Sequence, residues 1–90
     1  MKLISKNKVS NTFSIPTWLK SKGYTPNFDY AKLTTYAGSP VYGLFRLIDD
    51  KYITYAIVVI GGYRYVFEMT KGSRDVKQEF IDELSNNNWT

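Results

Sequence analysis

VYGLFRLIDDKYITYAIVVIGGYRYVFEM, residues 41–69, is the stretch that decides the fold of this 90-residue chain. It holds three runs rich in β-branched and aromatic residues, which favour strands. The runs are separated by Asp49-Asp50-Lys51 and by Gly61-Gly62, and the glycine pair can adopt the positive φ angles of a two-residue hairpin turn. The stretch therefore predicts an antiparallel meander with strands over Val41–Ile48, Tyr52–Ile60 and Tyr63–Met69.

The hairpin turns assign the side chains of this meander to two faces, because side chains alternate along a strand. A two-residue turn at Gly61-Gly62 pairs Ile60 with Tyr63. For the other turn, Asp49-Asp50 and Asp50-Lys51 both remain open, and both give the same division between the faces. The first face consists of Phe45, Leu47, Thr54, Ala56, Val58, Ile60, Tyr63, Tyr65, Phe67 and Met69. The second face consists of Tyr42, Leu44, Arg46, Ile48, Ile53, Tyr55, Ile57, Val59, Arg64, Val66 and Glu68.

The first face carries no charge, whereas the second carries every charge within the strands, namely Arg46, Arg64 and Glu68. Burying an unpaired charge is costly. We therefore expect the first face to form the core beneath the helices. Tyr65 and Phe67 should then be less exposed than the charged side chains of the second face.

The second face nevertheless holds many apolar groups, more than a monomer normally leaves in water. We expect either the chain itself, through residues 1–11 and 24–40, or a binding partner to cover it. If the turn is at Asp50-Lys51, Arg46, Tyr55 and Glu68 lie in one row across the sheet, which is typical of a solvated face.

Two segments outside the meander predict helices. The first segment is Phe13–Gly23, in which the hydroxyl of Ser14 suits the N-cap. Pro16 falls in the first turn, where a missing amide costs nothing. Phe13 and Trp18 then occupy the two positions of a hydrophobic staple. The second segment, Ser73–Leu84, begins with a serine N-cap and has one apolar face, formed by Val76, Phe80, Ile81 and Leu84.

The two remaining segments are less regular. Residues 1–11 favour a strand. Residues 24–40 contain Pro26, Gly38 and Pro40 and predict either a helical turn near Phe28–Leu33 or a strand near Lys32–Ala37. Together these patterns indicate a single α+β domain over residues 1–90. Its sheet is an antiparallel meander of three strands, with four or five as the alternative. A short N-terminal helix and a longer C-terminal helix pack on one face.

The composition excludes several kinds of chemistry. The chain has no Cys and no His, so it lacks disulfides, thiolate metal sites and the commonest catalytic base. We interpret Asp49-Asp50 as a polar hairpin tip and not as a metal site. We therefore predict no catalytic residues, no metal, no cofactor and no enzymatic activity. No run reaches the roughly 18 apolar residues of a membrane span, and the N-terminus does not resemble a signal peptide. We expect a cytoplasmic protein that has no membrane partner.

Charge is distributed unevenly along the chain. The net charge is +4, of which the residues up to Arg46 carry +6 and those from Asp49 onward −2. Basic side chains neutralise phosphates, and aromatic side chains stack on bases. The candidate nucleic-acid-binding residues are Lys2, Lys6, Lys8, Lys20, Lys22, Trp18 and Tyr24. We therefore expect a binding protein that acts by stoichiometric occupancy, with a nucleic acid or a nucleoprotein complex as its leading partner.

Protein binding is the alternative. Exposed Tyr and Arg are typical hot-spot residues of interfaces, and the candidate protein-binding residues on the second face are Tyr42, Arg46, Tyr55 and Arg64. The small size and the content of Lys, Asn, Ile and Tyr make the chain similar in style to many small phage-encoded proteins. Such proteins often inhibit a host protein by occupancy, as anti-CRISPR and anti-restriction proteins do. This similarity rests on composition and not on a motif.

Overall fold

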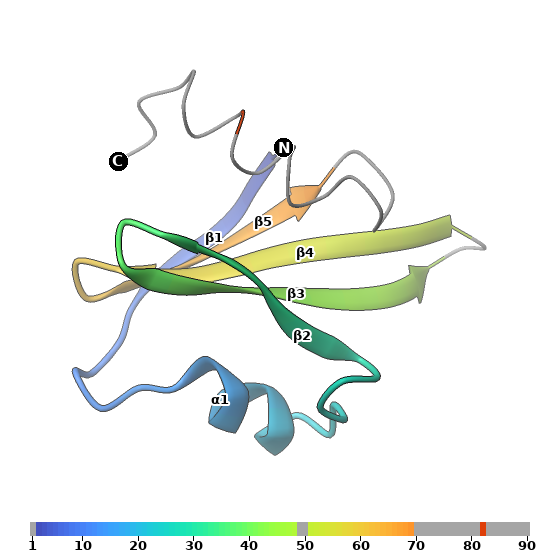
Figure 1. Ribbon diagram of the computed structural model, residues 1–90, viewed down its shortest axis with the longest axis horizontal. Helices are drawn as coiled ribbons and strands as arrows, with labels where there is room; N and C mark the ends of the chain where they lie inside the picture. The colour runs from blue at the N-terminus through green and yellow to red at the C-terminus, as the bar shows by residue number, and fades with distance from the viewer. Residues whose placement is uncertain (1, 49–50, 70–81, 83–90) are drawn as a thin grey trace.

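The computed structural model describes residues 2–48, 51–69 and 82, and it places five antiparallel strands in one sheet (Figure 1). The strand order is β1-β5-β4-β3-β2, so β2 to β5 form a meander and β1 pairs with β5 at one edge. The strands are β1 Lys2–Lys8, β2 Tyr30–Tyr36, β3 Ser39–Ile48, β4 Lys51–Ile60 and β5 Tyr63–Met69. The one helix whose bounds are described is α1, Ile15–Ser21, and Asp82 is a further described residue in helical conformation.

The β4–β5 hairpin has the register that the sequence predicts. Ile60 pairs with Tyr63, and Thr54 pairs with Met69. The turn forms because both residues of Gly61-Gly62 have positive φ angles, 60° and 82°, which glycine adopts without steric cost. The prediction for this hairpin is confirmed, and with it the division of the side chains between two faces.

The β3–β4 hairpin settles the turn that the sequence left open. Ile48 pairs with Lys51, so the connection is Asp49-Asp50. This register places Arg46 opposite Ile53 and not opposite Tyr55. The row of two charges around a tyrosine, expected from the alternative turn, is therefore wrong. Arg46 faces an aliphatic side chain across the strand pair.

Both of the less regular segments form edge strands. Residues 1–11 contain β1, as predicted, and it pairs with β5. Residues 24–40 contain β2, so the strand alternative is confirmed and the helical turn is wrong. Ala37 and Gly38 have φ angles of 51° and 81° and form the two-residue turn between Tyr36 and Ser39. The sheet therefore has five strands, the largest number among the alternatives that the sequence left open.

Strand β2 has an irregularity that brings it against the first face. Its register with β3 shifts between Lys32 and Thr34, which leaves Leu33 as an extra residue. A Cβ atom on Gly43 would lie 2.9 Å from the Leu33 side chain, so the glycine is what allows this close approach. Leu33 and Tyr36 consequently pack against the core of the first face.

The largest difference from the expectation concerns the helix. α1 lies on the side of the second face, where its buried residues join one of two apolar cores (Figure 1). This second-face core consists of Ile15, Leu19, Tyr30, Leu44 and Ile57. The prediction of a three-stranded meander with two helices on the first face is therefore wrong. The charges of the second face do not prevent this packing, because they lie at its margins: Arg46 is exposed and Glu68 is half-buried.

The first face forms the other core. Its buried residues are Val41, Ala56, Val58, Tyr65, Phe67 and Met69. Tyr65 and Phe67 are 5% and 1% exposed, less than the exposed Arg46 and the half-buried Glu68, so the expectation that this face is buried is confirmed. The sheet is therefore apolar on both faces.

The helix predicted over Ser73–Leu84 lies outside the described residues, apart from Asp82.

Candidate functional site

The candidate site is built on α1 and on the segment that enters it. Ser14 occupies the N-cap in an extended conformation and Pro16 follows in the first turn, as predicted, but the Ser14 hydroxyl does not make the expected capping hydrogen bond. The rings of Phe13 and Trp18 lie 6.0 Å apart at an interplanar angle of 54°, which confirms the hydrophobic staple. Because Leu19 is fully buried beneath the helix, its neighbour Trp18 is held half-buried at the helix edge.

Arg64 reaches this aromatic pair from strand β5. Its guanidinium carbon lies 4.0 Å from the centre of the Trp18 ring and 5.6 Å from that of Phe13. A cation over an aromatic face is attracted by the ring quadrupole, the more so when the pair is partly desolvated. The arginine that the sequence placed on an open sheet face is therefore half-buried beside the helix.

Arg64 also lacks a counter-ion among the described residues. Its Nε atom is buried and has no hydrogen-bond partner there. The carboxylates of the described part of the chain belong to Asp29, Glu68 and Asp82. Asp29 accepts a hydrogen bond of 2.6 Å from the backbone amide of Thr25. Glu68 lies four residues along the same strand, which is about 13 Å, and Asp82 lies across the sheet from α1 (Figure 1).

Two further cations lie over the aromatic side chains of this region. The ammonium nitrogen of Lys22, just after α1, is 5.3 Å from the centre of the Trp18 ring. Beyond the helix, Gly23 has a φ angle of 90° and the amide of Tyr24 donates to the Leu19 carbonyl at 3.1 Å. This turn brings the Tyr24 ring beneath Arg46, whose guanidinium carbon is 5.4 Å from the ring centre.

The structure therefore combines two sets that the sequence kept apart. Trp18 and Tyr24 come from the predicted nucleic-acid set, whereas Arg46 and Arg64 come from the predicted protein-binding set. We call the combined group the aromatic–cation surface; it consists of Phe13, Trp18, Lys22, Tyr24, Arg46 and Arg64. The sequence could not predict these pairs, because they depend on which face of the sheet the helix covers. The staple pattern was the one signal that pointed to Phe13.

The other predicted residues lie elsewhere or are partly covered. Lys20 is exposed on α1 beside the aromatic–cation surface. Lys6 of β1 lies 4.8 Å from the ring centre of Tyr63, on the side of the first face. Lys8 pairs with Tyr63 and Lys2 with Glu68 at that same edge of the sheet. The remaining two predicted residues pack against the second-face core and are half-buried, namely Tyr42 and Tyr55.

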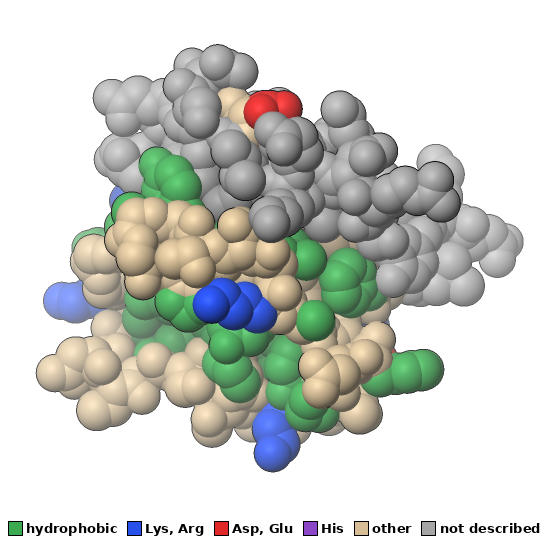
Figure 2. Space-filling view, in the orientation of Figure 1, with side chains coloured by type: hydrophobic (Ala, Val, Ile, Leu, Met, Phe, Trp, Pro, Cys, Tyr) green, Lys and Arg blue, Asp and Glu red, His purple; other side chains and the backbone are tan. Residues whose placement is uncertain are grey.

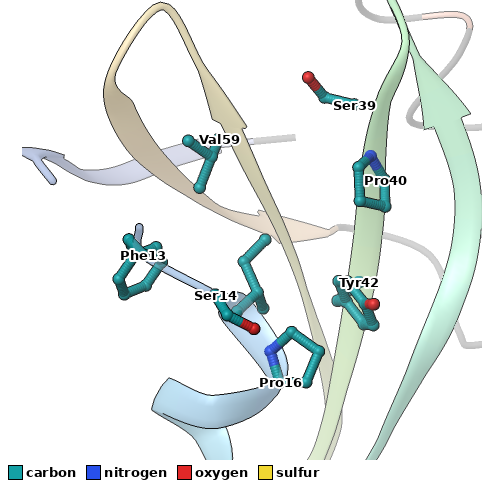
Figure 3. Close-up of a pocket in the computed structure, with 8 residues that line it drawn as sticks. Phe13, Ser14, Pro16, Ser39, Pro40, Tyr42 and Val59 are labelled. Carbon is teal, nitrogen blue, oxygen red and sulfur yellow. The ribbon is translucent and has the colours of Figure 1, made fainter. Parts of the chain in front are cut away.

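Two cavities flank the entry to α1. The first, of about 290 Å³, lies between the start of the helix and strands β3 and β4 (Figure 3). We call it the strand-side cavity; it is lined by Phe13, Ser14, Ile15, Pro16, Ser39, Pro40, Tyr42 and Val59. The second, of about 320 Å³, is the hydroxyl cavity, lined by Ser10, Thr12, Phe13, Ser14, Thr17, Trp18 and Ser21. Phe13 and Ser14 form the wall that the two cavities share.

Comparisons with known proteins do not extend this picture: no family model, no curated protein and no solved structure matches the chain. Within the described residues, no group of three His, Cys, Asp or Glu side chains could hold a metal ion. The described helix is too short to cross a membrane. The chemistry open to the site is therefore that of its own cations, rings and cavities.

Proposed function

We propose that this chain is a non-enzymatic binding protein and that it binds a nucleic acid, alone or within a nucleoprotein complex, through the aromatic–cation surface. The observation that carries the proposal is Arg64, a half-buried cation that is stacked on Trp18 and has no carboxylate partner among the described residues. A buried charge is costly unless it is paired. An anionic ligand supplies the missing partner.

Phosphate is the anion that suits this arrangement best. A guanidinium stacked on a ring keeps its N–H donors at its edge, where they can form two parallel hydrogen bonds to a phosphate. Lys20 and Lys22 lie on and just after α1, whose Trp18 contacts Arg64, so these cations can neutralise neighbouring phosphates of one backbone. Arg46 lies at the opposite end of the second face, because it pairs with Ile53 whereas Arg64 pairs with Val59, six residues or about 20 Å further along β4. It can therefore neutralise a more distant phosphate of the same backbone. On the face shown in Figure 2, Lys and Arg side chains lie over the sheet and at the bottom over α1, whereas the described carboxylate in view is at the opposite end.

A second candidate function, occupancy of a host protein in the style of small phage inhibitors, is favoured by one observation. Phe28 is 82% exposed in the loop before β2, and a large exposed aromatic side chain is typical of a protein-binding hot spot. Phe28 lies one residue from Asp29, whose carbonyl accepts a hydrogen bond from Phe45, so the loop is tied to the strand that carries Arg46.

The charge-reversed double variant Lys20→Glu with Lys22→Glu tests the proposed function. We expect its affinity for an oligonucleotide to fall by about 100-fold at low salt, because two phosphate contacts are lost and two repulsive charges are added. Fluorescence anisotropy with a labelled oligonucleotide measures the effect. Lys6→Glu with Lys8→Glu, on β1, is the matched control; it reverses two exposed charges on the side of the first face and should change the affinity by only a few fold.

Two outcomes would contradict the proposal. Either the wild-type chain binds no oligonucleotide at low salt, or the double variant binds as tightly as the wild type. Loss of binding on truncating Phe28 to alanine, with no effect of the lysine reversals, would favour the protein-directed function instead.

A further inference from the structure

We infer that the strand-side cavity accepts an unpaired nucleobase, so that the nucleic acid bound by this chain is single-stranded. The inference rests on the proposed function and names its ligand class. It is carried by the position of the cavity beside the unpaired Arg64, and by the chemistry of the cavity wall.

The size of the strand-side cavity suits a single ring system. Its volume of about 290 Å³ is at the lower end of the roughly 300–1,000 Å³ of small-molecule sites. It is bounded by α1 on one side and by strands β3 and β4 on the other (Figure 3). A base within a duplex is stacked and paired and cannot enter such a space, whereas an unpaired base can turn into it.

The wall of the cavity provides flat apolar contacts for the faces of a base. Phe13 and Tyr42 contribute aromatic rings, Pro16 and Pro40 contribute saturated rings, and Val59 closes one end (Figure 3). Every base has a π face, so stacking on aromatic side chains tolerates any sequence. The cavity is therefore suited to recognise a base as a flat ring and does not require a particular base.

The cavity also offers a free polar group for the edge of a base. Ser14 is the N-cap of α1, but its hydroxyl makes no hydrogen bond to a backbone amide of the helix. The hydroxyl is directed into the space between the helix and β3 (Figure 3). A serine hydroxyl can both donate and accept a hydrogen bond, and unpaired bases present donors and acceptors at their edges.

Phosphate-binding groups lie on the other side of the same wall. The ring of Phe13 lines the strand-side cavity and also lies 5.6 Å from the Arg64 guanidinium carbon. The hydroxyl cavity begins behind Phe13 and Ser14 and continues past Trp18. When a single-stranded nucleic acid has one base in the strand-side cavity, the sugar and phosphate of that nucleotide thus lie beside serine and threonine hydroxyls and near Arg64 and Lys22.

A comparison of three ligands tests the inference on the wild-type chain. The ligands are a thymidine oligonucleotide of about 12 nucleotides, within the site sizes of small single-strand-binding folds, an abasic oligonucleotide of the same length, and the corresponding duplex. A uridine oligonucleotide distinguishes RNA from DNA. We expect the thymidine or uridine strand to bind about tenfold or more tightly than the abasic strand, because one stacked base contributes that much, and more tightly than the duplex.

A cavity-blocking variant makes the test specific to this site. Pro40→Trp places a larger ring at the exposed rim of the cavity, and it should lower the affinity for the thymidine strand about tenfold while leaving the abasic strand unaffected. Pro26→Trp is the matched control; Pro26 is also exposed and does not line this cavity. The denaturation midpoint of both variants shows whether they are folded.

The outcomes separate the inference from the proposed function. Equal binding of the thymidine and abasic strands, or a duplex bound as tightly as the single strand, would overturn the inference that the strand-side cavity accepts a base. An apolar side chain of another partner would then be the occupant of the cavity. The same holds if folded Pro40→Trp binds the thymidine strand like the wild type. Failure to bind any of the ligands at low salt would overturn the proposed function itself.

Discussion

Replacing Arg64 with methionine is expected to weaken nucleic-acid binding by about 10- to 100-fold while changing the free energy of unfolding by no more than about 1 kcal/mol. A hydrogen bond to a charged group is worth about 1.5–3 kcal/mol, and each 1.4 kcal/mol corresponds to a factor of about ten in affinity. Arg64 is the most enclosed cation of the aromatic–cation surface, so its contact with a phosphate gains most from the low local dielectric.

The small effect on stability follows from the unpaired Nε atom of Arg64. Removing a buried polar atom that has no partner costs little and can even be stabilising. A methionine sulfur also makes favourable contacts with aromatic rings, so it can replace the guanidinium between Phe13 and Trp18. The affinity is measured by fluorescence anisotropy and the unfolding free energy by urea denaturation.

Arg46→Met provides the control for this prediction. Arg46 is exposed and lies over the Tyr24 ring, so its contact with a phosphate is more strongly screened by solvent. We expect its replacement to lower the affinity by only a few fold. If Arg64→Met unfolds the chain, or binds as tightly as the wild type, Arg64 is a structural residue and not an anion-binding one.

Leu19→Ala is expected to lower the free energy of unfolding by about 2–5 kcal/mol, which corresponds to roughly 10–30 °C in Tm for a domain of this size. Leu19 is fully buried and is one of the two α1 residues, with Ile15, that are buried in the second-face core. Truncation leaves a cavity between helix and sheet in addition to the loss of buried apolar surface.

Leu3→Ala is the matched control for this prediction, because Leu3 is 45% exposed on the edge strand β1. Its truncation should lower the free energy of unfolding by well under about 1 kcal/mol. Thermal unfolding followed by circular dichroism measures both variants. Equal effects of the two substitutions would show that α1 is not packed on the sheet as described.

The sequence predicted the local structure well wherever a short-range rule decides it. The two-residue turn at Gly61-Gly62 follows from backbone sterics, and it sets the register of β4 and β5. The N-cap at Ser14 and the ring contact of Phe13 with Trp18 likewise depend on residues a few positions apart. None of these features requires knowledge of the rest of the chain.

The sequence failed where the outcome depends on long-range packing. The charges of the second face indicated an open surface, yet α1 packs there, because Leu44 and Ile57 occupy the middle of that face and the charged residues its margins. Alternation along a strand assigns a residue to a face but says nothing of its distance from the centre of that face. The site was missed for the same reason, since the contact between Trp18 and Arg64 exists only once α1 covers the second face.

The dependence of oligonucleotide binding on salt concentration tests the central claim most directly. If Lys20, Lys22, Arg46 and Arg64 each neutralise a phosphate, the logarithm of the association constant should fall with the logarithm of the salt concentration with a slope of about −2 to −3, at about −0.7 per phosphate of a single strand. A slope near zero, or the absence of binding at the lowest salt concentration, would contradict recognition of a phosphate backbone by these cations.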